Sequence, residues 1–169
     1  MKKWHAFTFF GMWGNMGSDP YMPVFTQQIK KLGVDTHGSP YNDMVATGLI
    51  HTINEIPSDE GVFLAGTSLG ANNIAIIAYS VRRTIEGMFG FQASSYGAKN
   101  YPVQNNVKWA HLISSWNPIP MPFLGTYRWP VGTIVESRYL REWHNIPHPG
   151  DYDEGDRAKF LKEMKRCMS

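Results

Sequence analysis

The pentapeptide at 66–70 is a Gly-x-Ser-x-Gly motif in which the hydroxyl of Ser68 could act as a nucleophile. An apolar run precedes it at 61–65, and an alanine- and isoleucine-rich run follows it. This pattern predicts a strand that breaks at a sharp turn and becomes a helix, with the serine in strained backbone geometry and its hydroxyl exposed. The helix N-terminus adds free N–H groups and partial positive charge. An ordinary structural turn is the alternative.

A serine hydroxyl is a weak nucleophile until a neighbouring base takes its proton, so this chemistry also requires an imidazole. Three histidines follow Ser68 in the chain: His111, His144 and His148. His111 falls inside an expected strand, where a buried structural role is favoured. The other two fall in one loop before the last expected helix, and an ordinary surface-loop role remains open for either.

Strand and helix patterns alternate along the chain. The expected strands are 5–11, 34–37, 61–67, 107–115 and 131–137. The expected helices are 23–32, 40–56, 69–83 and 156–167, and a connection rich in glycine, serine and tyrosine spans 86–106. Alternation of this kind predicts a three-layer α/β/α fold with a mostly parallel central sheet of about five strands. Ligands of such sheets bind at the carboxyl ends of the strands, where Ser68 falls.

Composition limits the other possibilities. The chain has 169 residues, of which 43% are hydrophobic, and a formal net charge of +2. We expect one domain, residues 1–169, and no nucleic-acid partner, because the basic residues form no concentrated stripe. The single cysteine, Cys167, leaves no disulfide framework. Because the six histidines lack the spacing of a metal motif, we expect no metal site. Hydrolysis through a serine nucleophile would need no organic cofactor, so we expect none.

The N-terminal residues superficially resemble a secretion signal, with a basic start followed by an apolar stretch at 4–10. That stretch is short, contains His5 and lacks a small-residue cleavage site, so we interpret it as the first strand and expect a cytoplasmic protein. No segment approaches the roughly 18 consecutive apolar residues of a membrane span. The oligomeric state cannot be inferred from these patterns.

The segment 61–80 resembles the nucleophile region of the α/β-hydrolase family, in a small form close to the minimal lipase and cutinase-like members. In element order the resemblance covers nearly the whole chain. It implies a triad in the order serine, acid, histidine, with the acid after a late strand and the histidine in the loop before the last helix. The base is then His144 or His148. We favour His144, because a histidine shortly before an Ile-Pro turn and an acidic stretch is similar to that loop in small family members.

The same order offers two positions for the acid. After the strand at 107–115 the position falls to Asn117, which can orient an imidazole but cannot offset its positive charge. After the strand at 131–137 the candidate is Glu136, at a compact distance before His148. We take Glu136 as the acid, with a solvated glutamate paired to Arg138 or Arg141 as the alternative.

An oxyanion hole needs two backbone donors. One is the amide of Leu69, and the resemblance implies that the other comes from the glycine-containing loop after the first strand, where we choose Met12 over a simple turn. Candidate substrate contacts are Trp13 in that loop and Pro122 and Phe123 in the proline-rich segment 117–130. Capping of the sheet or a subunit contact is the alternative role for the latter segment.

These residues predict a serine hydrolase, an esterase or lipase acting on a small-molecule or lipid ester through an acyl-enzyme. The competing hypothesis is a catalytically silent binding or interaction protein with the same fold, which Asn117 motivates. A nucleotide-binding protein is disfavoured, because the 66–70 turn lacks the lysine of a phosphate-binding loop.

Overall fold

The computed structural model describes residues 2–10, 22–39, 43–67, 69–91, 101, 106–115, 134–140 and 154–169. The strands within them are β1 (Trp4–Phe9), β2 (Asp35–Ser39), β3 (Gly61–Thr67), β4 (Gly87–Phe91), β5 (Trp109–Ser115) and β6 (Ile134–Leu140). The helices are α1 (Met22–Lys30), α2 (Asp43–Glu55), α3 (Leu69–Ser80) and α5 (Glu154–Met168). None of the helices in these ranges has the length and apolar character needed to cross a bilayer.

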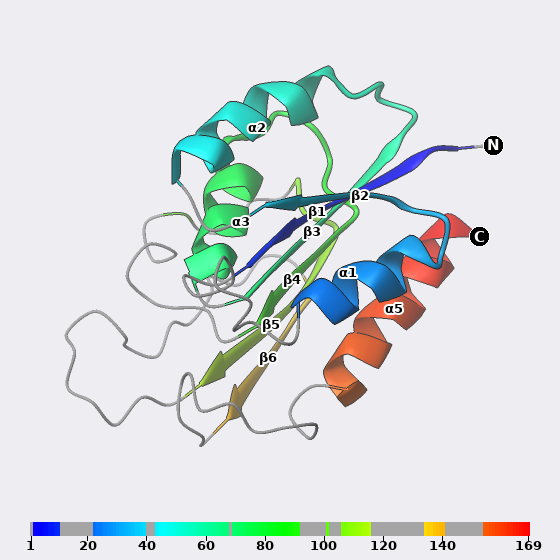
Figure 1. Ribbon diagram of the computed structural model, residues 1–169, viewed down its shortest axis with the longest axis vertical. Coiled ribbons are helices and arrows are strands. Elements are labelled where there is room, and N and C mark those ends of the chain that lie inside the picture. The colour runs from blue at the N-terminus through cyan, green and yellow to red at the C-terminus, as the bar shows by residue number, and fades with distance from the viewer. Residues whose placement is uncertain are drawn as a thin grey trace.

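The six strands form one sheet in the order β2-β1-β3-β4-β5-β6, and every neighbouring pair is parallel. Helices α2 and α3 cover one face of this sheet, and α1 and α5 cover the other (Figure 1). The expected three-layer α/β/α fold is therefore confirmed, with one strand more than the expected five.

The direction of strand addition reverses once along the chain. β2 is added on one side of β1, and β3 to β6 are added in turn on the other side. Because parallel crossovers are right-handed, this reversal puts α1 on the face opposite to α2 and α3. The reversal leaves a switch point between the carboxyl ends of β1 and β3, the place where open α/β sheets bind their ligands.

Two apolar cores lie on the two faces of the sheet. β3 is buried along its whole length because its side chains alternate between them. Val62 and Leu64 belong to the core under α2 and α3, whereas Phe63 and Ala65 belong to the core under α1 and α5. A strand buried on both faces reads as a continuous apolar run, which is why the sequence located β3 without error.

The last helix packs onto the sheet mainly through one ring. Phe160 is 1% exposed and lies among four other aromatic rings. The centroid distances are 5.6 Å to Phe25, 6.4 Å to Phe63, 5.2 Å to Phe89 and 4.8 Å to Trp109. These rings come from α1, β3, β4 and β5, so one side chain of α5 packs against four elements that share one core.

One strand was missed by the sequence analysis. The expected connection at 86–106 is wrong for β4, because the two glycines of this strand lower its apparent strand propensity. Packing explains one of them, since a Cβ on Gly87 would overlap the indole of Trp109. The last expected strand, 131–137, also ends three residues before the observed end of β6 at Leu140.

Helix α3 ends at Ser80, earlier than the expected 83, and Arg83 turns back toward the preceding helix. Its guanidinium donates hydrogen bonds to the carbonyl oxygens of Ile53 at 3.3 Å, Ile56 at 2.7 Å and Glu60 at 2.5 Å. Burial lowers the pKa of Arg83 from its ordinary value. This side chain closes the C-terminal end of α2 and holds the loop that leads into β3.

Candidate functional site

The strand-to-helix turn predicted from the sequence lies at the switch point of the sheet. β3 ends at Thr67 and α3 begins at Leu69, so the two elements flank position 68 directly. Ser68 itself lies outside the described residues. The site can therefore be built from its two flanks, each of which contains one glycine of the motif.

Gly66 lies where the end of β3 meets the first turn of α3. A Cβ at this position would overlap the carbonyl group of Gly70 and the backbone nitrogen of Ala71. The neighbouring atoms are backbone atoms, which cannot rotate away as a side chain could. The strand can approach the helix this closely only because residue 66 has no side chain.

Gly70 makes the corresponding contact with the other strand of the switch point. A Cβ here would overlap the carbonyl oxygens of Phe9 and Phe10, at the carboxyl end of β1. The first turn of α3 thus rests on β1 as well as on β3. The two glycines of the motif fix the start of α3 between the two strands.

The start of α3 carries the polar groups that this geometry makes available. The N–H of Leu69 belongs to the first turn, where helical N–H groups lack an acceptor within the helix and carry partial positive charge. Before the turn, the Oγ1 of Thr67 is buried and makes no hydrogen bond to any residue in the described ranges. The two flanks of the turn therefore carry polar groups, the first-turn N–H groups of α3 and the hydroxyl of Thr67.

The loop that follows β1 starts beside this turn. The N–H of Phe10 donates to the carbonyl oxygen of Ser39 at 3.1 Å, and its own carbonyl lies against Gly70. The chain therefore leaves β1 next to the first turn of α3. Met12 and Trp13, the residues chosen from this loop, lie outside the described residues.

The backbone distinguishes the two positions considered for the acid. Glu136 is the third residue of β6 and pairs in register with His111, four residues before the strand ends at Leu140. β5 ends at Ser115, so position 117 follows a strand end by two residues. Along the sequence, position 117 is therefore closer to a strand end than Glu136 is, and Asn117 itself lies outside the described residues.

The remaining candidate residues lie partly within and partly outside the described ranges. His111 is 6% exposed and its ring stacks on Phe89 at 5.8 Å between centroids, so the buried position expected for it is confirmed. The candidate bases His144 and His148 lie outside the described residues. The same holds for Pro122 and Phe123.

Comparisons with known proteins add a fold to this geometry. No protein-family model matches the sequence, and no curated protein matches it significantly. Among solved structures, a structure of RedJ with a polyethylene glycol molecule in its active site is similar, with a TM-score of 0.59 and 12% identity over 96% of this chain and 90% of that one. The two proteins share a fold.

A second solved structure supports the same conclusion. The protein in that second structure, from Xanthomonas campestris pv. campestris, has been assigned to the α/β hydrolase superfamily. Its TM-score is 0.50 with 13% identity, and 98% of each chain is covered. At these identities the likeness establishes the α/β-hydrolase fold alone.

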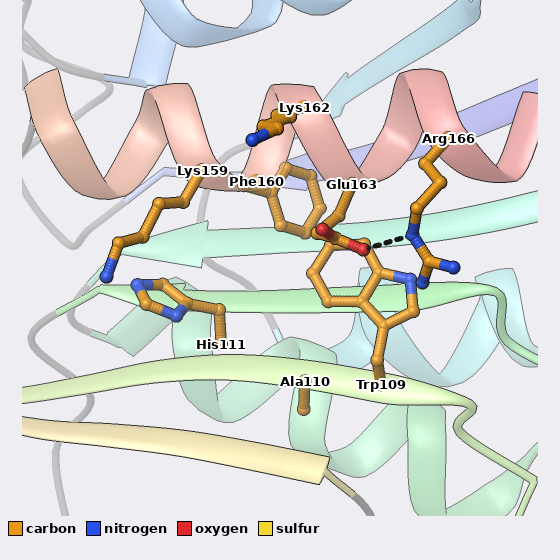
Figure 2. A pocket seen from close by; sticks show the side chains of 8 residues that line it. All are labelled: Trp109, Ala110, His111, Lys159, Phe160, Lys162, Glu163 and Arg166. Carbon is orange, nitrogen blue, oxygen red and sulfur yellow. Dashed lines mark hydrogen bonds and ion pairs between the residues drawn. The ribbon is translucent and has the colours of Figure 1, made fainter.

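Within this α/β-hydrolase fold, a cavity of about 350 Å³ lies between β5 and α5, away from the turn at position 68. Its lining residues are Trp109, Ala110, His111, Lys159, Phe160, Lys162, Glu163 and Arg166 (Figure 2). Figure 2 shows the Lys159 side chain reaching toward the His111 ring, and Arg166 donates to Glu163 at 2.7 Å. In the sheet, His111 lies beside Phe89 of β4, and Phe89 lies beside Ala65 of β3. The cavity is therefore level with a residue of β3 that lies two positions before the end of that strand.

One polar cluster was not predicted from the sequence. His5 of β1, Asp35 and His37 of β2, and Glu60 before β3 meet at the end of the sheet where the strands begin. Histidine spacing along the chain gave no sign of it, because the two histidines are separated by a complete helix. The available signal was the alternation in β2, which puts Asp35 and His37 on one face beside the first strand.

Proposed function

We propose that this protein is a serine hydrolase, an esterase or lipase that cleaves a small-molecule or lipid ester with Ser68 as the nucleophile. The observation that carries the proposal is the packing of Gly66 and Gly70, which brings the start of α3 against the carboxyl ends of β1 and β3. This is the strand–turn–helix context in which a Gly-x-Ser-x-Gly serine is held in an exposed, strained position. The α/β-hydrolase fold agrees with it.

In this proposal the Oγ of Ser68 attacks the ester carbonyl carbon while a histidine, His144 or His148, takes the hydroxyl proton. The N–H groups of Leu69 and Met12 stabilise the negative charge that develops on the carbonyl oxygen. When the tetrahedral intermediate collapses, the alcohol leaves with the proton from the imidazolium. Water then attacks the acyl-enzyme and gives a proton to the same imidazole, which passes it to the Oγ of Ser68 as the carboxylic acid leaves.

The third member of the triad is Glu136 or the residue at position 117. A carboxylate stabilises the imidazolium that forms during the reaction, whereas the amide of Asn117 can only orient the ring. A chain that uses Asn117 would therefore be a slow hydrolase. Activity of the Glu136→Gln variant separates the two, because a large loss identifies Glu136 and an unchanged rate excludes it.

Substrate contacts are proposed for Trp13, Pro122 and Phe123, whose apolar surfaces suit an acyl chain or an aromatic group. Thioesters and amides would use the same nucleophile, base and oxyanion donors. Hydrolysis rates for a matched series of oxygen ester, thioester and amide with one acyl group would rank these substrate classes.

The nucleophile is tested with a fluorophosphonate probe, which reacts covalently with activated serines. The wild-type protein should be labelled, and mass spectrometry should locate the adduct on Ser68. Ser68→Ala should abolish labelling. Ser80→Ala, at the exposed end of α3, is the matched control and should leave labelling unchanged.

The outcome also decides between the two functional hypotheses. Folded protein that resists the probe under conditions that label a known serine esterase would exclude the hydrolase and favour the silent binding protein. Adducts on serines other than Ser68 would likewise exclude the proposed nucleophile, even if the sample hydrolysed esters.

A further inference from the structure

The end of the sheet where the strands begin carries a polar cluster that the proposed function does not use. His5 lies on β1, and Asp35 is its register partner on the neighbouring strand β2. His37 is the register partner of Phe7, two residues further along the same strands. Both pairs lie on one face of the sheet, because residues two apart in a strand share a face.

The side-chain atoms of this cluster converge. The Nδ1 of His5 lies 3.3 Å from the Nε2 of His37 and 4.0 Å from the Oδ2 of Asp35. One ligand atom from each of these three residues lies within 4.8 Å of the other two. Two imidazole nitrogens and a carboxylate oxygen are the donor set that binds zinc and similar divalent transition ions.

A carboxylate orients the buried histidine. The Nε2–H of His5 donates a hydrogen bond to the Oε2 of Glu60 at 2.6 Å. In this tautomer of the neutral ring, the lone pair lies on Nδ1. That lone pair faces the cluster. Metal-binding histidines commonly donate their second nitrogen to a carboxylate in this manner, which fixes the tautomer and the ring orientation.

Glu60 is itself held by the fold. Its backbone carbonyl accepts a hydrogen bond from the guanidinium of Arg83, which also binds the carbonyl of Ile56 in the same loop. His5 is only 6% exposed. The cluster therefore combines one buried, preoriented ligand with two ligands on the exposed strand β2.

We propose that His5, His37 and Asp35 form a binding site for a divalent transition-metal ion such as Zn²⁺, with Glu60 positioning His5. Two nitrogens bound to zinc at about 2.0–2.1 Å with a tetrahedral angle are about 3.3–3.4 Å apart, which matches the observed separation. The carboxylate of Asp35 must move closer, by about 0.7 Å toward His5, and its side chain is 52% exposed and so has room to do this by rotation. Water would complete four-coordination.

The exposed ligand is also held in position. The ring of His37 stacks on Phe7 at 4.6 Å between centroids. Without a metal, the Nε2–H of His37 donates to the Nδ1 of His5, and metal binding requires the other tautomer of His37.

The site would join three parts of the fold that are distant in sequence. It links the outermost strand β2 to β1 and, through Glu60, to the loop before β3. An ion that binds only the folded chain stabilises it by mass action. The proposed ion thus has a structural role, and it lies at the opposite end of the sheet from Ser68.

The test uses the full chain, stripped of metal with a chelator and titrated with ZnCl₂ by isothermal calorimetry. One ion per chain should bind, and thermal unfolding should shift to higher temperature in its presence. Co²⁺ should give the intense visible absorption of a four-coordinate site, and Zn²⁺ should remove it. Absence of stoichiometric Zn²⁺ binding would overturn the proposal.

Variants assign the ligands. His37→Gln and Asp35→Asn, both on exposed positions, should weaken Zn²⁺ binding at least about tenfold, and Glu60→Gln should weaken it about 10–100-fold. His51→Gln is the control, because His51 is an exposed histidine on α2 that pairs with Glu55 at 3.2 Å. Thermal unfolding without metal shows whether each variant is folded.

Two results would contradict the assignment in a chain that does bind Zn²⁺. One is that the His37→Gln and Asp35→Asn variants are both folded and both bind Zn²⁺ as tightly as the wild type does. The other is loss of binding in His51→Gln or in the double variant His144→Gln/His148→Gln, which would place the ion on other histidines.

Discussion

The two ends of the central sheet depend on different kinds of contact. At the carboxyl end, the contacts that hold the turn around position 68 are backbone contacts, permitted by Gly66 and Gly70. At the amino end, the cluster is made of side chains, in which His5 and His37 approach each other across two strands. The first arrangement fails when a side chain is added, and the second fails when one is removed.

This difference allows the two ends to be tested separately. At the carboxyl end, an added methyl group would displace the neighbouring backbone, so it should reduce stability and activity together. A polar substitution on exposed β2 removes a ligand and leaves the backbone contacts of the sheet in place. Measurements of nucleophile reactivity, metal affinity and stability on one set of variants should therefore separate the two ends.

The largest effect is expected for Ser68→Ala at the carboxyl end. Ester hydrolysis should fall by at least about 10⁴-fold, because the covalent step is lost while binding remains. Zinc affinity should equal that of the wild type, since the ligands lie at the other end of the sheet. The measurements are the release of p-nitrophenol from a short-chain ester and calorimetric titration with Zn²⁺. Unchanged hydrolysis would remove Ser68 from the mechanism.

Gly70→Ala should destabilise the protein by about 2–4 kcal/mol, because the new Cβ overlaps the carbonyls of Phe9 and Phe10. Urea unfolding measures the change in the free energy of unfolding. Probe labelling of the remaining folded protein should also fall, because the start of α3 must shift.

The matched control for this methyl group is Gly48→Ala. Gly48 lies inside α2, and a Cβ there meets no atom within 4 Å. The substitution should stabilise the protein by about 0.5–1 kcal/mol through helix propensity. If Gly70→Ala and Gly48→Ala had the same effect, the close packing at the switch point would be refuted.

Arg83→Met should destabilise the protein by about 2–3 kcal/mol, because the carbonyls of Ile56 and Glu60 lose a charged donor. Zinc affinity should fall several-fold, since the loop that positions Glu60 is released. Labelling of Ser68 in the folded fraction should not change. Chemical unfolding and calorimetry measure the first two effects.

Arg82→Met controls for the loss of a positive charge at almost the same position. The Arg82 side chain is exposed, so its removal should change stability by no more than about 0.5 kcal/mol. Equal losses in both variants would show that the hydrogen bonds of Arg83 are not the cause.

The smallest effect is expected for Lys3→Gln, and it has the opposite sign. The Nζ of Lys3 lies 3.4 Å from the Oδ2 of Asp35, where it competes with a cation for the carboxylate. Removing this exposed ion pair should tighten Zn²⁺ binding by about two- to fivefold. Lys30→Gln, on the exposed side of α1, should have no effect on affinity. Weaker binding in Lys3→Gln would argue against Asp35 as a ligand.

The sequence was informative wherever the signal was local. The strand 61–67 and the helix start at 69 could be predicted because burial on both faces and the glycine spacing are written in consecutive residues. The missed strand β4 shows the limit, because one of its two glycines, Gly87, is explained by packing against Trp109, a residue about twenty positions later. The expected strand 131–137 stops three residues before Leu140, and this made Glu136 look closer to a strand end than it is.

The histidine cluster could not be predicted because it depends on register between strands. His5 and His37 meet only after α1 has returned the chain and β2 has aligned with β1. A shift by a single residue would have turned His37 to the opposite face of the sheet. Constellations that span two strands therefore require the fold before they can be recognised.

The position of Phe160 has a consequence for biosynthesis. Its ring fills the space between Phe25, Phe63 and Phe89. In a nascent polypeptide on the ribosome, the apolar core on this face of the sheet therefore stays uncovered until α5 has emerged. During that interval the apolar surface is open to solvent or to a chaperone. Newly made molecules should accordingly be most vulnerable to aggregation after β5 has been made and before α5 has packed onto the sheet, however stable the folded protein is.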